Sequence, residues 1–319
     1  MKKPTKHSVL VIGSVNMDLL LNASRVPFEG ESLIGTHYCY IAGGKGANQA
    51  VALSRLGAEV TFVGRIGNDA HGAVLADSLR KEGVNTHLVV PDFEAPTGLA
   101  VNLVSANAHN MILVFPGANM RLSNSDLTQA FCERDYDALI MQLEVPTEVV
   151  IEACRLARMR AIPVILDAGP AQDFPLELVP GIAILTPNET ETLALTGIEV
   201  NNLAGAEAAA LRLICRSGAK AVVIKLGSRG ALLLTAEGEK KYFPACKVDA
   251  VDATAAGDAF TAAMTIRYLE SEDIFEAIAF GNVAGGLATT TLGAQCALPT
   301  RLQVEQFMQQ SEVTWGADV

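Results

Sequence analysis

The sequence predicts an α/β protein, a three-layer sandwich with a mainly parallel central sheet and a small second sheet. Short runs rich in Val, Ile and Leu alternate with segments of helical spacing along nearly the whole chain. The strand runs are apolar along their full length, as in parallel sheets that helices cover on both faces. Residues 31–43 and 97–117 break the alternation, because each contains strand patterns and polar turns with no helix between them.

The first half of the chain follows this alternation closely. "HSVLVIG" predicts a strand, and "ANQAVALSRLGA" predicts a helix that a glycine ends. "EVTFVGRIG" predicts the next strand, and "DAHGAVLADSLRKEG" a helix with Asn68 or Asp69 as its cap. Inserted strands within about residues 16–45 and 97–117 predict a small β-sheet lid. The alternative is a hairpin that extends the main sheet.

The second half predicts the rest of the sheet. "DALIMQLE", "IPVILDAG", "IAILTPN" and "AVVIKLG" predict strands, "PTEVVIEACRLARMRA" a helix and "GALLLTAEGEKKYFPA" a hairpin. "VDAVDATAAGDAFTAAMTIRYLE" predicts a strand, a loop of small residues and a long helix. Because 319 residues can bury one large core, we expect a single domain over residues 1–319.

Composition excludes several classes of protein. The net charge is −11 and no basic cluster follows the N-terminal tail, so we expect no nucleic-acid partner. No apolar run approaches the ~18 to 20 residues of a membrane span, so we expect no membrane partner. Gly13, Asn16 and Asp18 interrupt the N-terminal apolar stretch, which favours a core strand over a signal peptide. Six dispersed cysteines without paired spacing are typical of a reduced, cytoplasmic protein.

The glycine-rich segment 41–50, "IAGGKGANQA", resembles a phosphate-binding loop in composition only. Cys39 stands where the Walker pattern needs a glycine, and Gly46 stands where Ser or Thr should follow the lysine. The dinucleotide pattern lacks its third glycine. The glycines still permit close backbone approach, and Lys45 and Asn48 add hydrogen-bond donors. The segment therefore suits a polar small ligand, with an ordinary tight turn as the alternative.

The segment "ATAAGD" carries the strongest catalytic signal. Ala255, Ala256 and Gly257 leave the backbone N–H groups uncovered at a helix N-terminus, where the helix dipole favours an anion. A carboxylate beside an anion hole is unexpected in a purely structural role, because Asp258 would repel a bound anion. Its position is explained if Asp258 accepts a proton from an attacking hydroxyl while the anion hole holds a transferring phosphoryl group. The alternative is that Asp258 only caps the helix.

Three further segments point to the same edge of the sheet. Asn188, Glu189 and Glu191 cluster after a strand, which suits Mg²⁺-bound water or an acidic helix start. Residues 224–230, "IKLGSRG", place two glycines at a strand end, where open α/β sheets bind ligands; the alternative is a simple turn. Glu144 ends an apolar strand and faces the same rim, unless it lies in a surface turn.

Seven motifs in order give the chain a family resemblance. They are "GSVNMD", "GGKGANQA", "MQLEVP", "TPNETE", "KLGSRG", "DATAAGD" and "GAQCALP". Together they resemble the PfkB carbohydrate-kinase family, and its ribokinases in particular, from about residue 9 to about residue 308. The resemblance implies a ribokinase-like fold whose small lid also serves as a homodimer clasp. It also implies Mg²⁺-dependent transfer of the ATP γ-phosphate to the 5-hydroxyl of D-ribose.

The resemblance also implies roles for individual residues. Asp258 would be the catalytic base, and Ala255, Ala256 and Gly257 the anion hole. The residues implied to hold the sugar are Asn16, Asp18, Gly43, Gly44, Lys45, Asn48, Glu144 and Asp258. Those implied to serve ATP and Mg²⁺ are Asn188, Glu191, Lys225, Gly227, Ser228, Arg229, Gly230, Gly257 and Asn282.

A monovalent cation, usually K⁺, activates members of this group. The matching positions are Asp252, Thr254, Ala288, Thr291, Gly293 and Ala297, and most would contribute backbone carbonyls. Ala297 departs from the pattern, because ribokinases often have a serine hydroxyl there. Asp167 is a second departure, since many carry Asn at that position. In the wider family a glycine usually replaces Ala255.

Other functions within the resemblance stay open. The acceptor could be 2-deoxyribose, a keto-sugar, a sugar phosphate or a nucleoside instead of ribose. A sugar-binding regulator that has lost turnover is a further alternative. The intact "AAGD" segment with Asp258 argues against the regulator, because these groups serve phosphoryl transfer rather than sugar binding.

Overall fold

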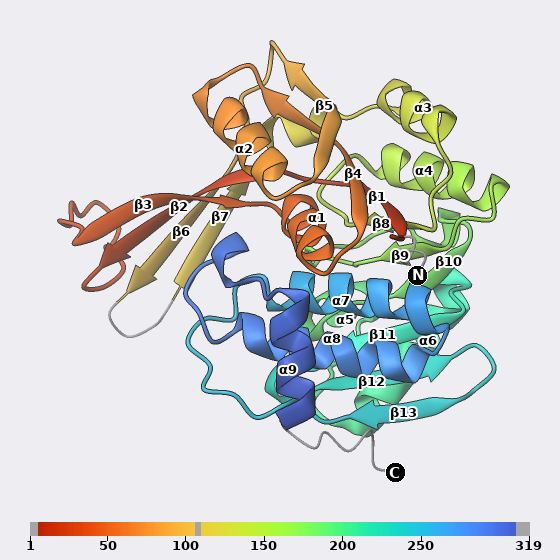
Figure 1. Cartoon of the computed structure of the whole chain (residues 1–319). Coiled ribbons are helices and arrows are strands. Elements are labelled where there is room, and N and C mark those ends of the chain that lie inside the picture. The colour runs from red at the N-terminus through yellow and green to blue at the C-terminus, as the bar shows by residue number, and fades with distance from the viewer. Residues whose placement is uncertain (1–5, 106–109, 311–319) are drawn as a thin grey trace.

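A nine-stranded sheet forms the centre of the molecule. The computed structural model describes residues 6–105 and 110–310 (Figure 1). Seven neighbouring strands run parallel, and the antiparallel β12 and β13 extend one edge. In sheet order the strands are β13 (Lys240–Phe243), β12 (Ala231–Thr235), β11 (Ala221–Lys225), β10 (Ile182–Leu185), β9 (Val164–Leu166), β8 (Ala138–Met141), β1 (Ser8–Ile12), β4 (Glu59–Gly67) and β5 (Asn85–Asp92).

Helices cover both faces of this sheet, which confirms the predicted three layers. One face carries α1 (Lys45–Arg55), α2 (Ala70–Lys81), α7 (Ala256–Ser271), α8 (Ile274–Ala288) and α9 (Arg301–Gln310). The other carries α3 (Asn124–Glu133), α4 (Thr147–Met159), α5 (Glu189–Thr196) and α6 (Leu203–Ser217). The short 3₁₀ helices of the described residues are η1 (Gly117–Arg121), η2 (Leu176–Leu178), η3 (Gly227–Arg229) and η4 (Gln295–Ala297). None of the helices in the described ranges has the length and apolar character to cross a membrane.

The inserted strands form a separate four-stranded sheet that projects from the body (Figure 1). Its order is β3 (His37–Gly43), β2 (Asn16–Ala23), β6 (Gly98–Ser105) and β7 (Asn110–Phe115). The strands pair with one another and not with the main sheet, so the alternative of an extended main sheet is wrong. Asp18 pairs with Ile41 and Ala100 on one face, and Leu19 with Tyr40 and Val101 on the other.

The glycine-rich segment is a strand end and a helix start rather than a loop. β3 ends at Gly43, Gly44 is the N-cap, and α1 begins at Lys45. The backbone of Gly44 has a φ of 91°, and a side chain there would come within 2.7 Å of the backbone nitrogen of Asn16. The glycines therefore let α1 start directly against the backbone that leads into β2.

The segment before α7 is not a strand, contrary to the prediction from "VDAVDA". The N–H groups of Val251 and Asp252 donate to the carbonyl of Thr289, at 2.7 and 3.0 Å. These groups therefore bind the end of α8 rather than a neighbouring strand. At the start of α2, Asp69 rather than Asn68 is the cap, because its side chain accepts from the N–H of Gly72 at 2.8 Å.

Candidate active site

The candidate site lies at the carboxyl edge of the main sheet, where parallel α/β sheets bind ligands. Glu144 follows β8, Asp167 follows β9 and Lys225 ends β11. The N-termini of α1 and α7 bring Asn48 and Asp258 to the same place, and the Nδ2 atom of Asn48 donates to Asp258 at 2.9 Å. Because β8, β9, β10 and β11 are parallel neighbours, their ends meet at this edge.

Asp258 is a buried carboxylate held by two amides. Its side chain lies in the first turn of α7 and is only 4% exposed. Asn48 donates to Oδ2, and Gln49 Nε2 donates to Oδ1 at 3.0 Å. Burial raises the pKa of Asp258 to about 6; the positive charge of Lys45 opposes this rise and the negative charge of Asp167 adds to it. Above that pH the carboxylate is ionised and can accept a proton.

The predicted anion hole begins with a strained residue. Ala255 is the N-cap of α7 and has a φ of 60°, in the left-handed region that residues with a side chain rarely adopt. The N–H of Ala256 donates to the carbonyl of Ala253 at 3.2 Å. Within the described residues, the N–H of Gly257 donates to no backbone or side-chain acceptor. The same is true, among the described residues, of the N–H groups of Ala255 and Asp258, so this turn has free donors for an anion.

Two lysines converge on one buried carboxylate beside Asp258. Asp167 is fully buried and accepts from Lys225 Nζ and from Gln49 Nε2, both at 2.7 Å. Lys45 Nζ lies 3.7 Å from Asp167 and 3.7 Å from Glu191. Burial works to raise the pKa of Asp167, but Lys225 and Lys45 outweigh it and hold that pKa below its ordinary value.

The same carboxylates keep Lys45 charged. Burial works to lower the pKa of Lys45, but the negative charges of Asp167, Asp258, Glu191 and Glu144 hold it well above its ordinary value. The site thus carries a fixed positive charge among several carboxylates. Such a charge can attract a phosphoryl group as it leaves ATP.

The side of the site nearest the small sheet has buried polar atoms without partners. Asp18 Oδ1 and Asn48 Oδ1 are buried, and neither has a hydrogen-bond partner among the described residues. Burial, with the nearby charges of Glu144 and Asp258, raises the pKa of Asp18 to about 7. A side chain at Gly43 would clash with the Asp18 carboxylate. Unpaired buried polar atoms point to a polar ligand, and sugar hydroxyls could pair with both.

Glu144 and Asn16 are partly engaged by the protein itself. Glu144 Oε2 accepts from the hydroxyl of Ser14 and from the N–H of Lys45, the latter at 3.2 Å. Asn16 Oδ1 accepts from Asn119 Nδ2 at 2.7 Å. These contacts fix the orientation of both side chains at the start of the small sheet.

The predicted nucleotide side is built from helix and turn contacts. Asn188 caps α5: its side chain accepts from the N–H of Glu191 at 2.8 Å, and Glu191 accepts from the N–H of Asn188 at 2.7 Å. The acidic residues therefore lie at a helix start, which was the alternative prediction. An isolated parallel β-bridge between Asn188 and Lys225 places this helix start beside the "KLGSRG" turn. Arg229 donates to the carbonyl of Val200 at 2.7 Å.

The last predicted residue on the nucleotide side is Asn282, and the site must also accommodate a divalent cation. Asn282 lies in α8 and its Nδ2 atom donates to the carbonyl of Phe243 at 3.3 Å. Across the described residues, no group of three or more His, Cys, Asp or Glu side chains is placed to hold a metal ion. A divalent cation at Glu191 would therefore take most of its oxygen ligands from phosphate and water, as Mg²⁺ commonly does.

The predicted monovalent-cation positions lie on two segments tied together by Asp252. Its Oδ2 atom accepts from the N–H of Gly293 at 2.8 Å, and its Oδ1 atom from the N–H and hydroxyl of Thr254 at 2.9 and 2.7 Å. Nearby carbonyls, such as those of Thr289 and Leu292, accept hydrogen bonds.

The carbonyl groups of the six predicted cation ligands differ from these neighbours. Within the described part of the chain, none of them accepts a hydrogen bond from backbone or side chain. The six residues are Asp252, Thr254, Ala288, Thr291, Gly293 and Ala297. Free carbonyl oxygens are hard ligands that fit an alkali cation.

The fold and this site define a class of protein, the carbohydrate kinases. The model of the family described as "pfkB family carbohydrate kinase" matches residues 6–301, and the chain belongs to this family. The chain is 36% identical to the ribokinase of Haemophilus influenzae over 305 residues, which are 95% of this chain and 99% of that protein. It is 32% identical to the deoxyribokinase of Salmonella typhi over 306 residues, which are 95% of this chain and 99% of that protein.

A solved structure shows the same architecture. Arabidopsis thaliana ribokinase in complex with ribose and ATP matches with a TM-score of 0.88 at 32% identity. The match covers 96% of this chain and 100% of that chain. It confirms the predicted ribokinase-like fold over nearly the whole chain.

The structure gathers many of the predicted residues and adds some that the motifs did not reveal. Asn48 donates to Asp258, the charges of Lys45 and Asp18 interact with it, and Glu144 accepts from the N–H of Lys45. In the described part of the chain, Arg229 and Asn282 make no hydrogen bond with this group. Arg229 binds Glu189 and the carbonyl of Val200, and Asn282 binds the carbonyl of Phe243. Sequence reasoning missed Gln49 as a contact of Asp258. The only available signal was its place one residue after Asn48 at the start of α1.

Proposed function

We propose that this chain is a ribokinase that transfers the γ-phosphate of ATP to the 5-hydroxyl of D-ribose. The observation that carries the proposal is Asp258, a buried carboxylate at a helix N-terminus. It accepts hydrogen bonds from Asn48 and Gln49 and interacts with the positive charge of Lys45. Membership of the family and the similarity to ribokinases along the whole chain support it.

The residues divide the work of in-line transfer. Asp18, Asn48 and Glu144 would orient the sugar, and Asp258 would take the proton of its attacking hydroxyl. Lys45 and the N–H of Gly257 would stabilise charge on the transferring phosphoryl group. Bound Mg²⁺ would supply charge neutralisation of the phosphate oxygens, held through water by Asn188 and Glu191.

The direct test is ADP release from ATP and Mg²⁺ with a panel of acceptors: D-ribose, 2-deoxyribose, fructose, fructose 6-phosphate and adenosine. We expect D-ribose to give the highest kcat/KM and the product to be ribose 5-phosphate, with the position assigned by ³¹P NMR. Higher kcat/KM with another acceptor would overturn the choice of ribose and keep the kinase. Ribose binding without turnover on any acceptor would favour the sugar-binding regulator.

We further propose that K⁺ binds the free carbonyls described above and activates the enzyme. The absence of hydrogen bonds to these carbonyls, within the described residues, is the supporting observation. We also propose a cytoplasmic location, since the structure pairs none of the six cysteines in a disulfide.

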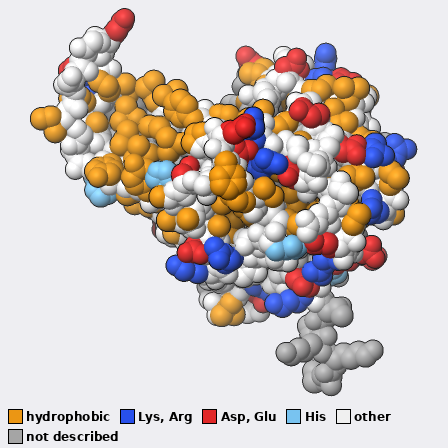
Figure 2. All heavy atoms as spheres, turned by 90° about the horizontal axis from the view of Figure 1, so that it is seen from above, with side chains coloured by type: hydrophobic (Ala, Val, Ile, Leu, Met, Phe, Trp, Pro, Cys, Tyr) orange, Lys and Arg blue, Asp and Glu red, His pale blue; other side chains and the backbone are white. Residues whose placement is uncertain are grey.

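We propose that the small sheet acts as a lid and that its apolar outer face joins two copies of the chain. This outer face is defined by Tyr38, Tyr40, Met111, Leu113 and Phe115, which are 51 to 65% exposed. Figure 2 shows hydrophobic side chains gathered over this projection. So much apolar surface is unusual on a monomer and typical of an interface.

The dimer proposal predicts that one negative charge on the outer face of the small sheet separates the two copies. Leu113→Glu should convert a dimer to a monomer in sedimentation velocity at micromolar concentration, because burying a carboxylate in an apolar interface is costly. Leu302→Glu on α9 is the matched control, since both leucines are 62% exposed, and it should stay dimeric. A native protein that sediments only as a monomer would remove the proposal.

A further inference from the structure

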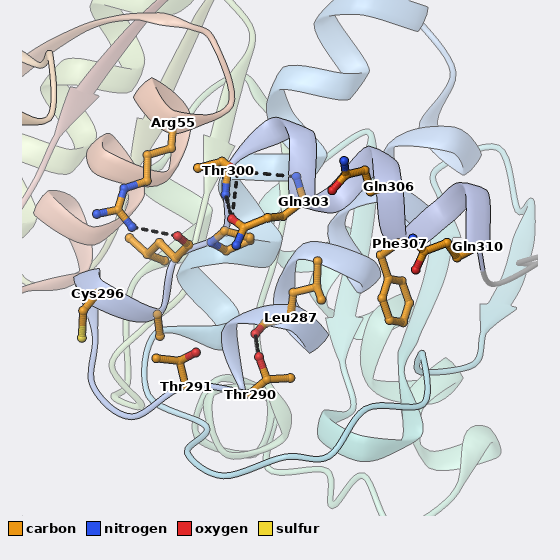
Figure 3. A pocket seen from close by; sticks show the side chains of 13 residues that line it. Arg55, Leu287, Thr290, Thr291, Cys296, Thr300, Gln303, Gln306, Phe307 and Gln310 are labelled. Carbon is orange, nitrogen blue, oxygen red and sulfur yellow. Dashed lines mark hydrogen bonds between the residues drawn. The ribbon is translucent and has the colours of Figure 1, made fainter.

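Arg55, the last residue of α1, ties the segment around Ala297 to the body of the protein. Its Nη1 atom donates to the carbonyls of Gln295 and Leu298, both at 2.7 Å. Figure 3 shows the guanidinium aimed at this segment from α1. Its Nε and Nη2 atoms bind Glu82 at 2.9 and 2.7 Å. One side chain therefore joins α1, the residue after α2, and the segment that contains Ala297.

Arg55 binds the carbonyls of Gln295 and Leu298, and the free carbonyl of Ala297 lies between them in the sequence. Those of Gln295 and Leu298 are satisfied, while that of Ala297 accepts no hydrogen bond from the described residues. The rigid, planar guanidinium can serve two carbonyls and one carboxylate at once, which an ammonium group cannot do with the same geometry. Arg55 thus fixes the backbone on both sides of Ala297.

The segment is largely buried, with Leu298 in the core, but a pocket borders it on one side. A cavity of about 410 Å³ is lined by Thr291, Ala297, Leu298 and Phe307, together with Arg55 itself (Figure 3). Side chains that border a cavity lack close partners on that side. Packing places the segment, and two charge-assisted hydrogen bonds from Arg55 fix the direction of its backbone beside the pocket.

The far end of the same segment reaches the catalytic helix. The N–H of Gly293 binds Asp252, and Asp252 holds Thr254, the residue before Ala255. A contiguous path of hydrogen bonds and backbone therefore runs from Arg55 through residues 293–298 to the N-terminus of α7. Among the described residues, Arg55 makes no hydrogen bond or ion pair with the proposed sugar residues or with Asp258.

We infer that Arg55 is a positioning residue that sets how tightly the free carbonyls of this segment bind a monovalent cation. The inference rests on the proposed function, in which these carbonyls bind K⁺. Without Arg55, the carbonyl of Ala297 loses its fixed direction, and the cation must order the segment itself as it binds. That ordering costs free energy, so a higher K⁺ concentration is needed.

The test compares Arg55→Gln with the native chain over a K⁺ titration, with choline chloride keeping the ionic strength constant. The first readout is the midpoint of K⁺ binding without substrates, fitted from the rise of the Tm with K⁺ concentration. The second is the K⁺ concentration that gives half-maximal activation. We expect both midpoints to rise about tenfold in the variant. The KM for ribose at saturating K⁺ should stay within twofold of the native value, since Arg55 does not touch the sugar residues.

Two further variants make the result specific. Arg301→Gln removes the same charge from a neighbouring arginine that contacts the carbonyl of Leu56 and Glu270 but not the segment around Ala297, and it should leave both midpoints unchanged. Arg55→Lys keeps the charge without the planar geometry and should shift both midpoints in the same direction as Arg55→Gln. It also serves if Arg55→Gln does not fold.

Each outcome decides a different question. If the native chain responds to K⁺ but both Arg55 variants respond at native concentrations, the inference is wrong and the K⁺ proposal stands. A shift of equal size in Arg301→Gln would also overturn the inference, because loss of any nearby arginine would then suffice. If K⁺ changes neither the Tm nor the activity of the native chain, the proposed cation site itself is wrong.

Discussion

Asp258→Asn is expected to lower kcat about a thousandfold, within the range of general base catalysis. The amide keeps the size of the carboxylate but cannot accept the proton of the attacking hydroxyl. Steady-state ADP release measures the effect, and calorimetric titration with ribose should show affinity within a few-fold of native. The remaining turnover would come from Lys45 and the anion hole, which the variant leaves in place.

The pH dependence of the native chain gives a second readout of the same carboxylate. Because the pKa of Asp258 is about 6, kcat/KM should fall as the pH decreases through that value and the base becomes protonated. The acid limb should be absent or displaced in Asp258→Asn. A variant that keeps more than a tenth of native kcat would exclude Asp258 as the base.

Lys225→Met is expected to lower the free energy of unfolding by about 3 kcal/mol, as when one partner of a buried ion pair is removed. Asp167 is fully buried and Lys225 is its closest charged partner, at 2.7 Å. Lys45, at 3.7 Å, would compensate only in part. Urea unfolding followed by circular dichroism at pH 7 measures the loss. The variant should also bind ATP more weakly, because the family resemblance implies that Lys225 serves the nucleotide.

A control variant distinguishes the effect of burying the ion pair from the effect of removing one lysine charge. Lys240→Met removes an exposed ion pair with Glu207 at 3.0 Å and should cost less than about 1 kcal/mol. The double variant Lys225→Met with Asp167→Asn should recover part of the loss, because it leaves no unpaired carboxylate. If Lys225→Met and Lys240→Met lower the free energy of unfolding equally, the buried ion pair contributes no more to stability than the exposed one.

The loss should also depend on pH in a defined direction. The folded state holds the pKa of Asp167 below its ordinary value, so the ion pair contributes its full stability above the unfolded pKa of about 3.9. That contribution disappears as the pH falls through the lower, folded pKa. The difference between native and Lys225→Met should therefore shrink on acidification.

The architecture and the expected position of the site follow from local sequence patterns. Continuous apolar strands alternating with amphipathic helices specify a parallel sheet, because only helices on both faces can bury such strands. The "AAGD" motif at the start of α7 indicates a helix N-terminus from local chemistry alone, whereas the start of α1 at Lys45 was not predicted from the glycine-rich segment. The strand predicted from "VDAVDA" failed because Thr289, distant in sequence, binds its N–H groups.

Which side chains contact one another depends on tertiary packing. Gln49 donates one amide group to both Asp167 and Asp258, across 118 and 209 residues of sequence. Arg55 reaches Gln295 across 240 residues. No local pattern encodes such pairs, because a hydrogen bond between distant segments depends on how α1 packs against the edge of the sheet and against α7. The sequence determined which chemical groups were available, and packing determined which of them act together.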